Sequence, residues 1–230
     1  MFVDLKRIVA GAASAATLAL FASAAHAVPQ LQLSDGTSTV TVIDQGVGDI
    51  DGLAGSIVFS GQVGGYFINV TTGVTKPVLG TAEDPQLDLN SINISGPGGG
   101  VLTIRFTETD FSSPGGSSDI FSAIGGTTSG NLQYQTFAST TNDPFQQDIL
   151  VSDSGLLSGP FVFSALSTIA ITGSYSLTTV ATITHTGATT QNSSFNAVVE
   201  LPEPFLAPPL VLGSLLIGST FVMRRRKKRA

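Results

Sequence analysis

The chain has 230 residues, among them 26 glycines, and it has no cysteine, so its stability must come from a packed core and not from disulfides. Between Val28 and Glu200, fourteen acidic side chains face two cations, Lys76 and Arg105, which gives this part a net charge of −12. A body this acidic excludes nucleic acid and anionic lipid as partners.

The first 27 residues have the pattern of a secretory signal peptide. Lys6 and Arg7 supply the positive start, an apolar run follows over 8–24, and Ala25-His26-Ala27 is an A-x-A cleavage box. We therefore expect the secretion translocon to export the chain and the mature protein to begin at Val28. The alternative is an uncut N-terminal anchor.

Residues 28–200 carry strand signals and no long helical periodicity. Around 101–107, Leu102, Ile104 and Phe106 share one face and Arg105 lies on the other. Tyr66 and the residues two and four places after it are expected to point inward. Strands are predicted at 39–43, 55–60, 65–71, 86–94, 101–107, 131–137, 161–171, 175–184 and 195–200.

Glycine-rich turns separate these runs, at 61–65, 96–100, 114–116 and 125–126. About ten strands with such turns predict an all-β fold, a single β-sandwich or jelly-roll domain over 28–200. A signal helix is expected before it and a transmembrane helix after it.

Candidates for catalysis are few. His185 is the one histidine left after signal removal, and a lone histidine at a strand end is typical of a surface or hydrogen-bonded residue. Glu108 and Asp110 lie two apart, which on a strand gives the spacing of paired glycosidase carboxylates; the alternative is a solvated strand end. Without a cysteine or a G-x-S-x-G elbow, we predict that the protein is not an enzyme.

The sequence contains only weak indications of a binding site for calcium or sugar. Asp44, Asp49 and Asp51 lie in a glycine-rich loop that could hold calcium, although the EF-hand ligand ladder is missing and such aspartates also cap turns without an ion. No other cofactor is predicted. Sugar sites commonly use aromatic platforms, but there is no tryptophan, and Tyr66, Tyr134 and Tyr175 are expected in the core or half-buried.

The last thirty residues, 201–230, have three parts in a fixed order. Pro202-Glu203-Pro204 comes first, an uncharged apolar run over 205–223 follows, and a basic cluster ends it: Arg224, Arg225, Arg226, Lys227, Lys228 and Arg229. With Pro204, the run is ~30 Å long as a helix, about one hydrocarbon core, and its basic end should stay cytoplasmic. An uncut stop-transfer anchor is the alternative. A sortase signal is set aside because Pro204 and Phe205 stand where it needs Thr and Gly.

This order resembles the PEP-CTERM sorting signal of Gram-negative bacteria. The resemblance implies recognition by exosortase, a membrane protease that removes the tail near Pro202-Glu203-Pro204, and a host that makes exopolysaccharide. The stretches 43–80, 85–95, 121–130 and 175–187 resemble an uncharacterised group of PEP-CTERM proteins, which transfers no catalytic or binding residue.

Together these features predict an exported protein, anchored transiently in the inner membrane and then released to the cell surface or the extracellular space. We expect a structural or interaction component of the envelope, exopolysaccharide or biofilm matrix. The alternative is a carbohydrate- or calcium-binding β-sandwich module.

Overall fold

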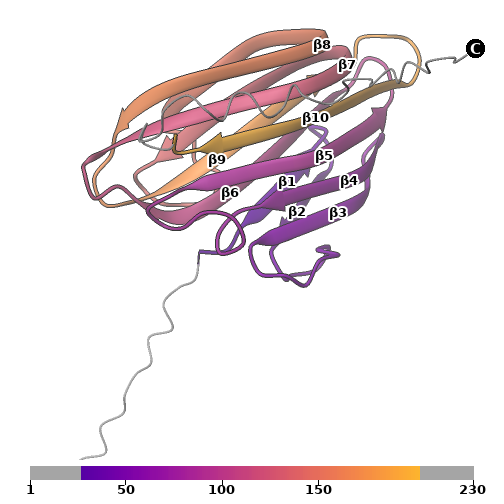
Figure 1. Cartoon of the computed structure of the whole chain (residues 1–230). Helices are drawn as coiled ribbons and strands as arrows, with labels where there is room; N and C mark the ends of the chain where they lie inside the picture. The colour runs from indigo at the N-terminus through magenta and orange to yellow at the C-terminus, as the bar shows by residue number, and fades with distance from the viewer. Residues whose placement is uncertain (1–26, 203–230) are drawn as a thin grey trace, which may run out of the picture.

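A computed structural model describes residues 27–202, and they form an all-β fold (Figure 1). The ten strands are β1 (Gln30–Ser34), β2 (Thr39–Ile43), β3 (Ser56–Val63), β4 (Tyr66–Val74), β5 (Gln86–Gly96), β6 (Val101–Ser112), β7 (Ser117–Ser139), β8 (Ile149–Ala170), β9 (Ser174–Thr184) and β10 (Gln191–Glu200). The all-β prediction is confirmed. Within 27–202 no helix is long and apolar enough to cross a membrane, and the predicted span at 205–223 lies outside the described residues.

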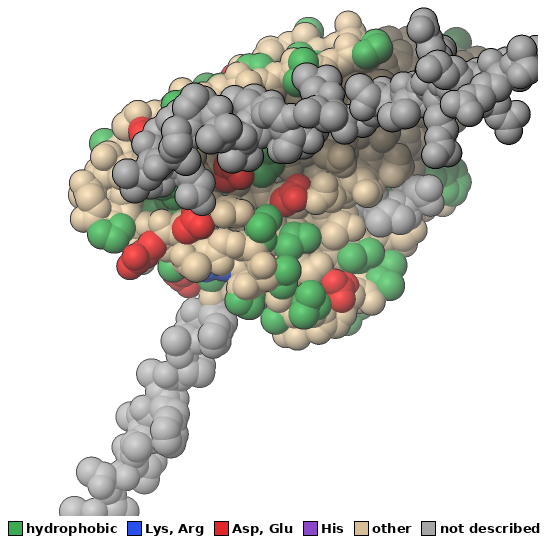
Figure 2. Space-filling model, in the orientation of Figure 1, with side chains coloured by type: hydrophobic (Ala, Val, Ile, Leu, Met, Phe, Trp, Pro, Cys, Tyr) green, Lys and Arg blue, Asp and Glu red, His purple; other side chains and the backbone are tan. Residues whose placement is uncertain are grey.

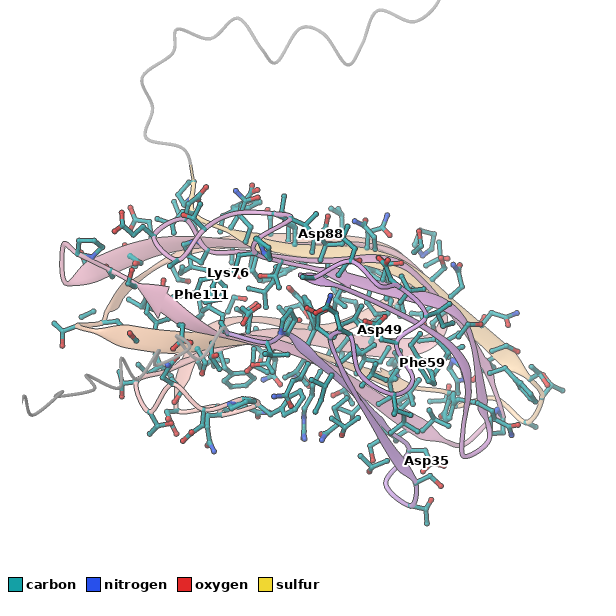
Figure 3. The ribbon with its side chains drawn as sticks, turned by 90° about the horizontal axis from the view of Figure 1, so that it is seen from below. Asp35, Asp49, Phe59, Lys76, Asp88 and Phe111 are labelled. Atoms are coloured by element: carbon teal, nitrogen blue, oxygen red, sulfur yellow. The ribbon has the colours of Figure 1, made fainter. Side chains whose placement is uncertain are left out.

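The strands make one antiparallel sheet that folds over into two sandwich-like layers with side chains packed between them (Figure 3). The strand order is β2-β1-β6-β9-β7-β10-β5-β4-β3, and β8 pairs with β7. Residues 131–139 of β7 pair with β9, whereas 121–128 pair with β10. The β7–β8 hairpin therefore completes both layers, one containing β9 and the other β10.

Glycines let β7 pass from one layer to the other. A Cβ on Gly126 would lie 2.2 Å from the Ser194 carbonyl oxygen, and one on Gly130 would lie 2.1 Å from the Thr184 carbonyl oxygen. The turn predicted at Gly125–Gly126 is therefore wrong, because both residues lie inside β7. Here glycine serves the close approach of two backbones and not a chain reversal.

The predicted core face of β6 is confirmed. Leu102, Ile104 and Phe106 are fully buried, while Arg105 is partly exposed and donates to the Gln32 side-chain oxygen at 3.0 Å. Tyr66, Tyr134 and Tyr175 are also buried, as predicted. Burial of these alternate side chains is the main contribution to stability that the fold offers.

One loop alters the predicted exposed face. Strand alternation places Thr107, two residues after Arg105, on the same exposed face, but Thr107 is fully buried. The loop at 140–148 lies over it, since Phe145 N–H donates to the Thr107 hydroxyl at 3.3 Å and the Ser176 hydroxyl donates to the Asp143 carbonyl at 2.9 Å. The pattern of alternation cannot reveal a cover of this kind.

Candidate functional site

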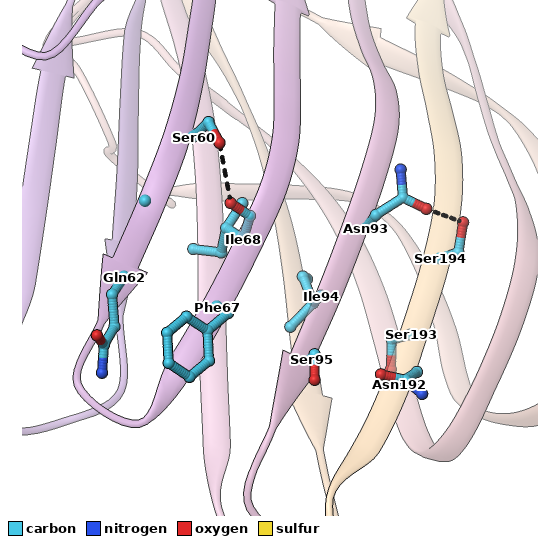
Figure 4. A pocket seen from close by; sticks show the side chains of 11 residues that line it. Ser60, Gln62, Phe67, Ile68, Asn93, Ile94, Ser95, Asn192, Ser193 and Ser194 are labelled. Carbon is cyan, nitrogen blue, oxygen red and sulfur yellow. Dashed lines mark hydrogen bonds between the residues drawn. The ribbon is translucent and has the colours of Figure 1, made fainter.

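A shallow groove of about 700 Å³ crosses the outer face of β3, β4, β5 and β10 (Figure 4). Side chains along these strands alternate between the two faces of the sheet. Inward residues such as Ile68 and Ile94 are buried, while their neighbours in the sequence point outward at the groove. Its lining residues are Ser60, Gly61, Gln62, Phe67, Ile68, Asn93, Ile94, Ser95, Asn192, Ser193 and Ser194.

The groove combines one aromatic ring with neutral polar groups. Phe67 is 60% exposed, and Figure 4 shows its ring beside Gln62. The Asn93 side-chain oxygen accepts from the Ser194 hydroxyl at 2.9 Å, and the Gln62 amide donates to the Gly64 carbonyl at 2.8 Å, so both amides are held in place. Among the described residues, no charged side chain lines this groove.

Two further depressions continue the same face toward β8. One of about 250 Å³ shares Asn192, Ser193 and Ser194 with the groove and reaches Pro160. Another, of about 370 Å³, lies at Asn90, Asn196 and Val162 and has one acid, Asp88, in its wall. Asn192, Ser194 and Asn196 alternate along β10 and all face outward. The three depressions therefore offer amides and hydroxyls from β3, β5, β7 and β10.

The three aspartates predicted as calcium ligands lie in one loop and bind backbone N–H groups. Asp49 accepts from Gln45 N at 2.9 Å and from Asp51 N and Val58 N at 3.0 Å each. Asp44 accepts from Gly55 N at 2.8 Å, and burial raises its pKa, with Asp49 and Asp51 adding to the rise. Within 27–202 no set of three or more His, Cys, Asp or Glu side chains is placed to hold a metal ion. Calcium binding stays a prediction, and turn capping is the role these contacts describe.

Glu108 and Asp110 do not form an exposed carboxylate pair. A register shift lies between Glu108 and Phe111, and Asp110 has a φ of 57°, so the strand bulges at this point. The Asp110 backbone N–H donates to the Asn142 side-chain oxygen at 2.8 Å, and the Asn142 side-chain amide donates to the Asp110 carboxylate at 2.5 Å. Glu108 is fully buried, so the alternative prediction, a solvated strand end, is also wrong.

Glu108 instead forms a buried ion pair with Lys76. The Lys76 Nζ is 3.5 Å from Glu108 Oε1, donates to the Thr109 carbonyl and lies 4.1 Å from the centre of the Phe111 ring (Figure 3). Burial raises the pKa of Glu108 to about 7, and the Lys76 charge opposes that rise. Glu108 Oε2 is buried and has no hydrogen-bond partner among the described residues. Sequence patterns did not connect Lys76 with Glu108, because only the fold brings β6 to the segment after β4.

His185 is buried and hydrogen-bonded; of the two interpretations from the sequence, a surface residue or a hydrogen-bonded one, the second is confirmed. Its Nε2 is 3.2 Å from the Ser193 hydroxyl, and its ring centre is 5.5 Å from that of Tyr66. Burial lowers the pKa of the imidazole. The side chain therefore fills the end of the core between the two layers.

The predicted processing residues lie at the margins of the described chain. Ala27 and Val28 stand just before β1, while Ala25 lies outside the described residues. Leu201 N–H donates to the Pro85 carbonyl at 3.3 Å, and Pro202 is the last described residue. Glu203, Pro204, Arg224, Arg225 and Arg226 lie outside the described residues.

Comparison with known proteins gives only distant structural matches. No family model and no curated protein matches the chain. The enzymatically active domain of tailspike protein 4 from bacteriophage CBA120 matches 54% of this chain and 18% of its own, with 15% identity and a TM-score of 0.31. The isomalto-dextranase of Arthrobacter globiformis T6, complexed with panose, matches 63% of this chain and 23% of its own, with 17% identity and a TM-score of 0.26. This chain thus spans about a fifth of the length of either protein.

These matches correct one prediction. We predicted that the protein is not an enzyme, whereas both of these similar structures are described as enzymes. The prediction is withdrawn on that finding. TM-scores of this size assign no activity, substrate or residue role to the chain.

Proposed function

We propose that this is an exported surface protein whose β domain binds a neutral polysaccharide in the groove across β3, β4, β5 and β10. The observation that carries the proposal is the exposed Phe67 ring among fixed amide and hydroxyl groups. Sugar hydroxyls can bond to such amides and hydroxyls, and the C–H face of a sugar ring can stack on an aromatic ring. Concave sites with a few placed polar groups are the usual form of binding sites.

The charge of the body favours a neutral ligand. Residues 28–200 carry a net charge of −12, and acidic side chains are spread over the face in Figure 2. An anionic polymer would be repelled by this surface and would find no cation in the groove to offset the repulsion. The two depressions that continue toward β8 favour a chain of several sugar units over a single sugar.

Phe67→Ala is expected to weaken binding of neutral polysaccharide by at least about tenfold, or ~1.4 kcal/mol. The probe is the extracellular polysaccharide of the producing strain, separated by anion exchange into neutral and acidic fractions. Binding of the full-length protein in detergent is measured by affinity electrophoresis in each fraction. Because Phe67 is exposed, the variant should keep its fold.

Val47→Ala is the matched control, since Val47 is 98% exposed in the loop before β3 and lies outside the groove. It should bind like the unaltered protein. Binding confined to the acidic fraction, or equal binding by Phe67→Ala, would show that the groove is not a site for neutral polysaccharide.

We further propose that the segment 201–230 is a PEP-CTERM sorting signal that exosortase cuts. The position of the motif supports this, because within residues 27–202 the last backbone hydrogen bond to the fold is made by Leu201, and Pro202 follows directly. Prolines keep a chain extended and remove backbone donors, which suits it to a protease cleft. A cut here would free the whole β domain from its membrane segment.

In the native host, the intact mass of the surface protein should therefore be that of a chain whose last residue lies near Pro204. Replacing both Pro202 and Pro204 by alanine should leave a larger species in the inner membrane, detected by mass spectrometry of separated membrane fractions. A native protein that still carries Ala230 would identify the tail as a permanent anchor.

A further inference from the structure

The outer edge of β8 is a long, open strand edge. β8 has 22 residues and pairs with β7 along its length, and among the described residues no strand pairs with its other side. In Figure 1 it lies at the border of the sheet. Such an edge presents a row of backbone N–H and C=O groups that can pair with another strand.

The two halves of β8 differ in how this edge is protected. The first half contains Asp153, Gly155 and Gly159, both glycines at positive φ, and Pro160 follows directly. Charges, bulges and prolines are the usual devices that prevent edge pairing. The segment from Phe161 to Ala170 contains no charge, no proline and no glycine.

The second half also exposes apolar side chains on the outer face. Val162 is 82% exposed and Leu166 is 62% exposed, while Phe161 and Phe163 pack partly against the core. Two acids lie near this half: Asp119 of β7 accepts a hydrogen bond from the Thr168 hydroxyl at 2.5 Å, and Asp88 shares a depression with Val162. On a body of net charge −12, a strand edge that carries no charge of its own is thus a place where a second acidic copy can approach.

We propose that residues 161–167 pair antiparallel with the same residues of a second copy, about a twofold axis at Ser164. In this register Val162 of one copy lies opposite Leu166 of the other, and the pair occurs twice. Because the paired residues 162 and 166 are an even number of positions apart, side chains that point outward in one copy lie beside side chains that point outward in the other. Pro160, which has no N–H to donate, limits the pairing at each end. The dimer would carry two copies of the outer sheet face side by side.

Cysteine cross-linking tests this register, because the natural chain has no cysteine. Residues directly opposite in an antiparallel pair have Cα atoms about 4.5–5.5 Å apart, within reach of a disulfide. The full-length Ser164→Cys protein in detergent should form a covalent dimer under mild oxidation on a non-reducing gel. Val162→Cys and Leu166→Cys should cross-link poorly alone and readily when mixed.

Association is then measured by sedimentation over about 1–100 µM. Val162→Lys should weaken it at least about tenfold, because a cation would lie against Leu166 of the other copy. Val47→Lys makes the same charge change at an exposed valine away from β8 and should associate normally. A monomer at every concentration, or dimers of Ser164→Cys that form no faster than those of Val162→Cys, would overturn the proposal.

Discussion

Replacing Lys76 by methionine is expected to lower the free energy of unfolding by about 2 kcal/mol more at pH 8.5 than at pH 5.5. At pH 8.5 Glu108 of the unaltered protein is ionised and paired with Lys76; without Lys76 it must either keep a buried charge with no counter-ion or take up a proton, and both cost stability. At pH 5.5 Glu108 is protonated, because burial raises its pKa to about 7. The variant then loses only packing, the bond to Thr109 and the contact with Phe111.

The same pKa gives the sign of the pH dependence in the unaltered protein. The folded pKa of Glu108 lies above its ordinary value of 4.5, so the folded state binds the proton more tightly than the unfolded chain. This contribution is fully present below about pH 4.5 and is lost as the pH rises through 7. His185 acts in the opposite direction, since its lowered pKa costs stability as the pH falls through 6.5. Comparison of variant and unaltered protein at each pH removes the contribution of His185.

Urea unfolding followed by tyrosine fluorescence measures both values, because all three tyrosines are buried. Lys76→Met combined with Glu108→Leu should recover most of the stability at pH 8.5, since both charges are gone. An equal loss at both pH values in Lys76→Met would mean that the ion pair does not set the stability of this region.

Gly126→Ala should lower the free energy of unfolding by about 1–3 kcal/mol or more. The added Cβ would lie 2.2 Å from the Ser194 carbonyl oxygen and 2.7 Å from Phe195 Cα, and these are backbone atoms that cannot turn aside. β7 and β10 would have to separate where the chain crosses between the layers. Thermal unfolding by circular dichroism measures the loss.

Gly115→Ala is the control for this substitution. A Cβ on Gly115 meets no atom within 4 Å, and the residue is not at positive φ, so its replacement should leave the melting temperature nearly unchanged. Equal melting temperatures for both variants would show that β7 has room beside β10 and that the crossing does not depend on glycine.

Local alternation predicted most strands, and the failures have identifiable causes. Leu102, Ile104 and Phe106 alternate with polar residues, so their strand and its buried face could be read directly. The first half of β7 was missed because Gly125 and Gly126 resemble a turn. Residues 149–160 were missed because Asp153, Gly155 and Gly159 interrupt the apolar pattern there, and only pairing with β7 holds that half of β8 extended.

The candidate groove could be predicted only in part. Naming Tyr66 and Ile68 as inward residues already placed Phe67 outside, and the structure confirms that placement. What the sequence could not supply was the neighbourhood of Phe67. Asn93 and Asn192 join it through the pairing of β5 with both β4 and β10, and the contacts between β5 and β10 span about a hundred residues of chain.

The position of β10, the last strand that the structure describes, has a mechanical consequence. β10 is hydrogen-bonded on both sides, to β5 over its whole length and to β7 from Ser193 to Glu200. If residues after Glu200 hold the protein to a surface, tension pulls β10 along its own axis and loads both ladders in shear. Many hydrogen bonds then resist together, whereas a tether on an edge strand such as β3 would peel them apart one by one. Drag on a polymer bound across β10 would thus pass to the tether through the strongest direction of the sheet.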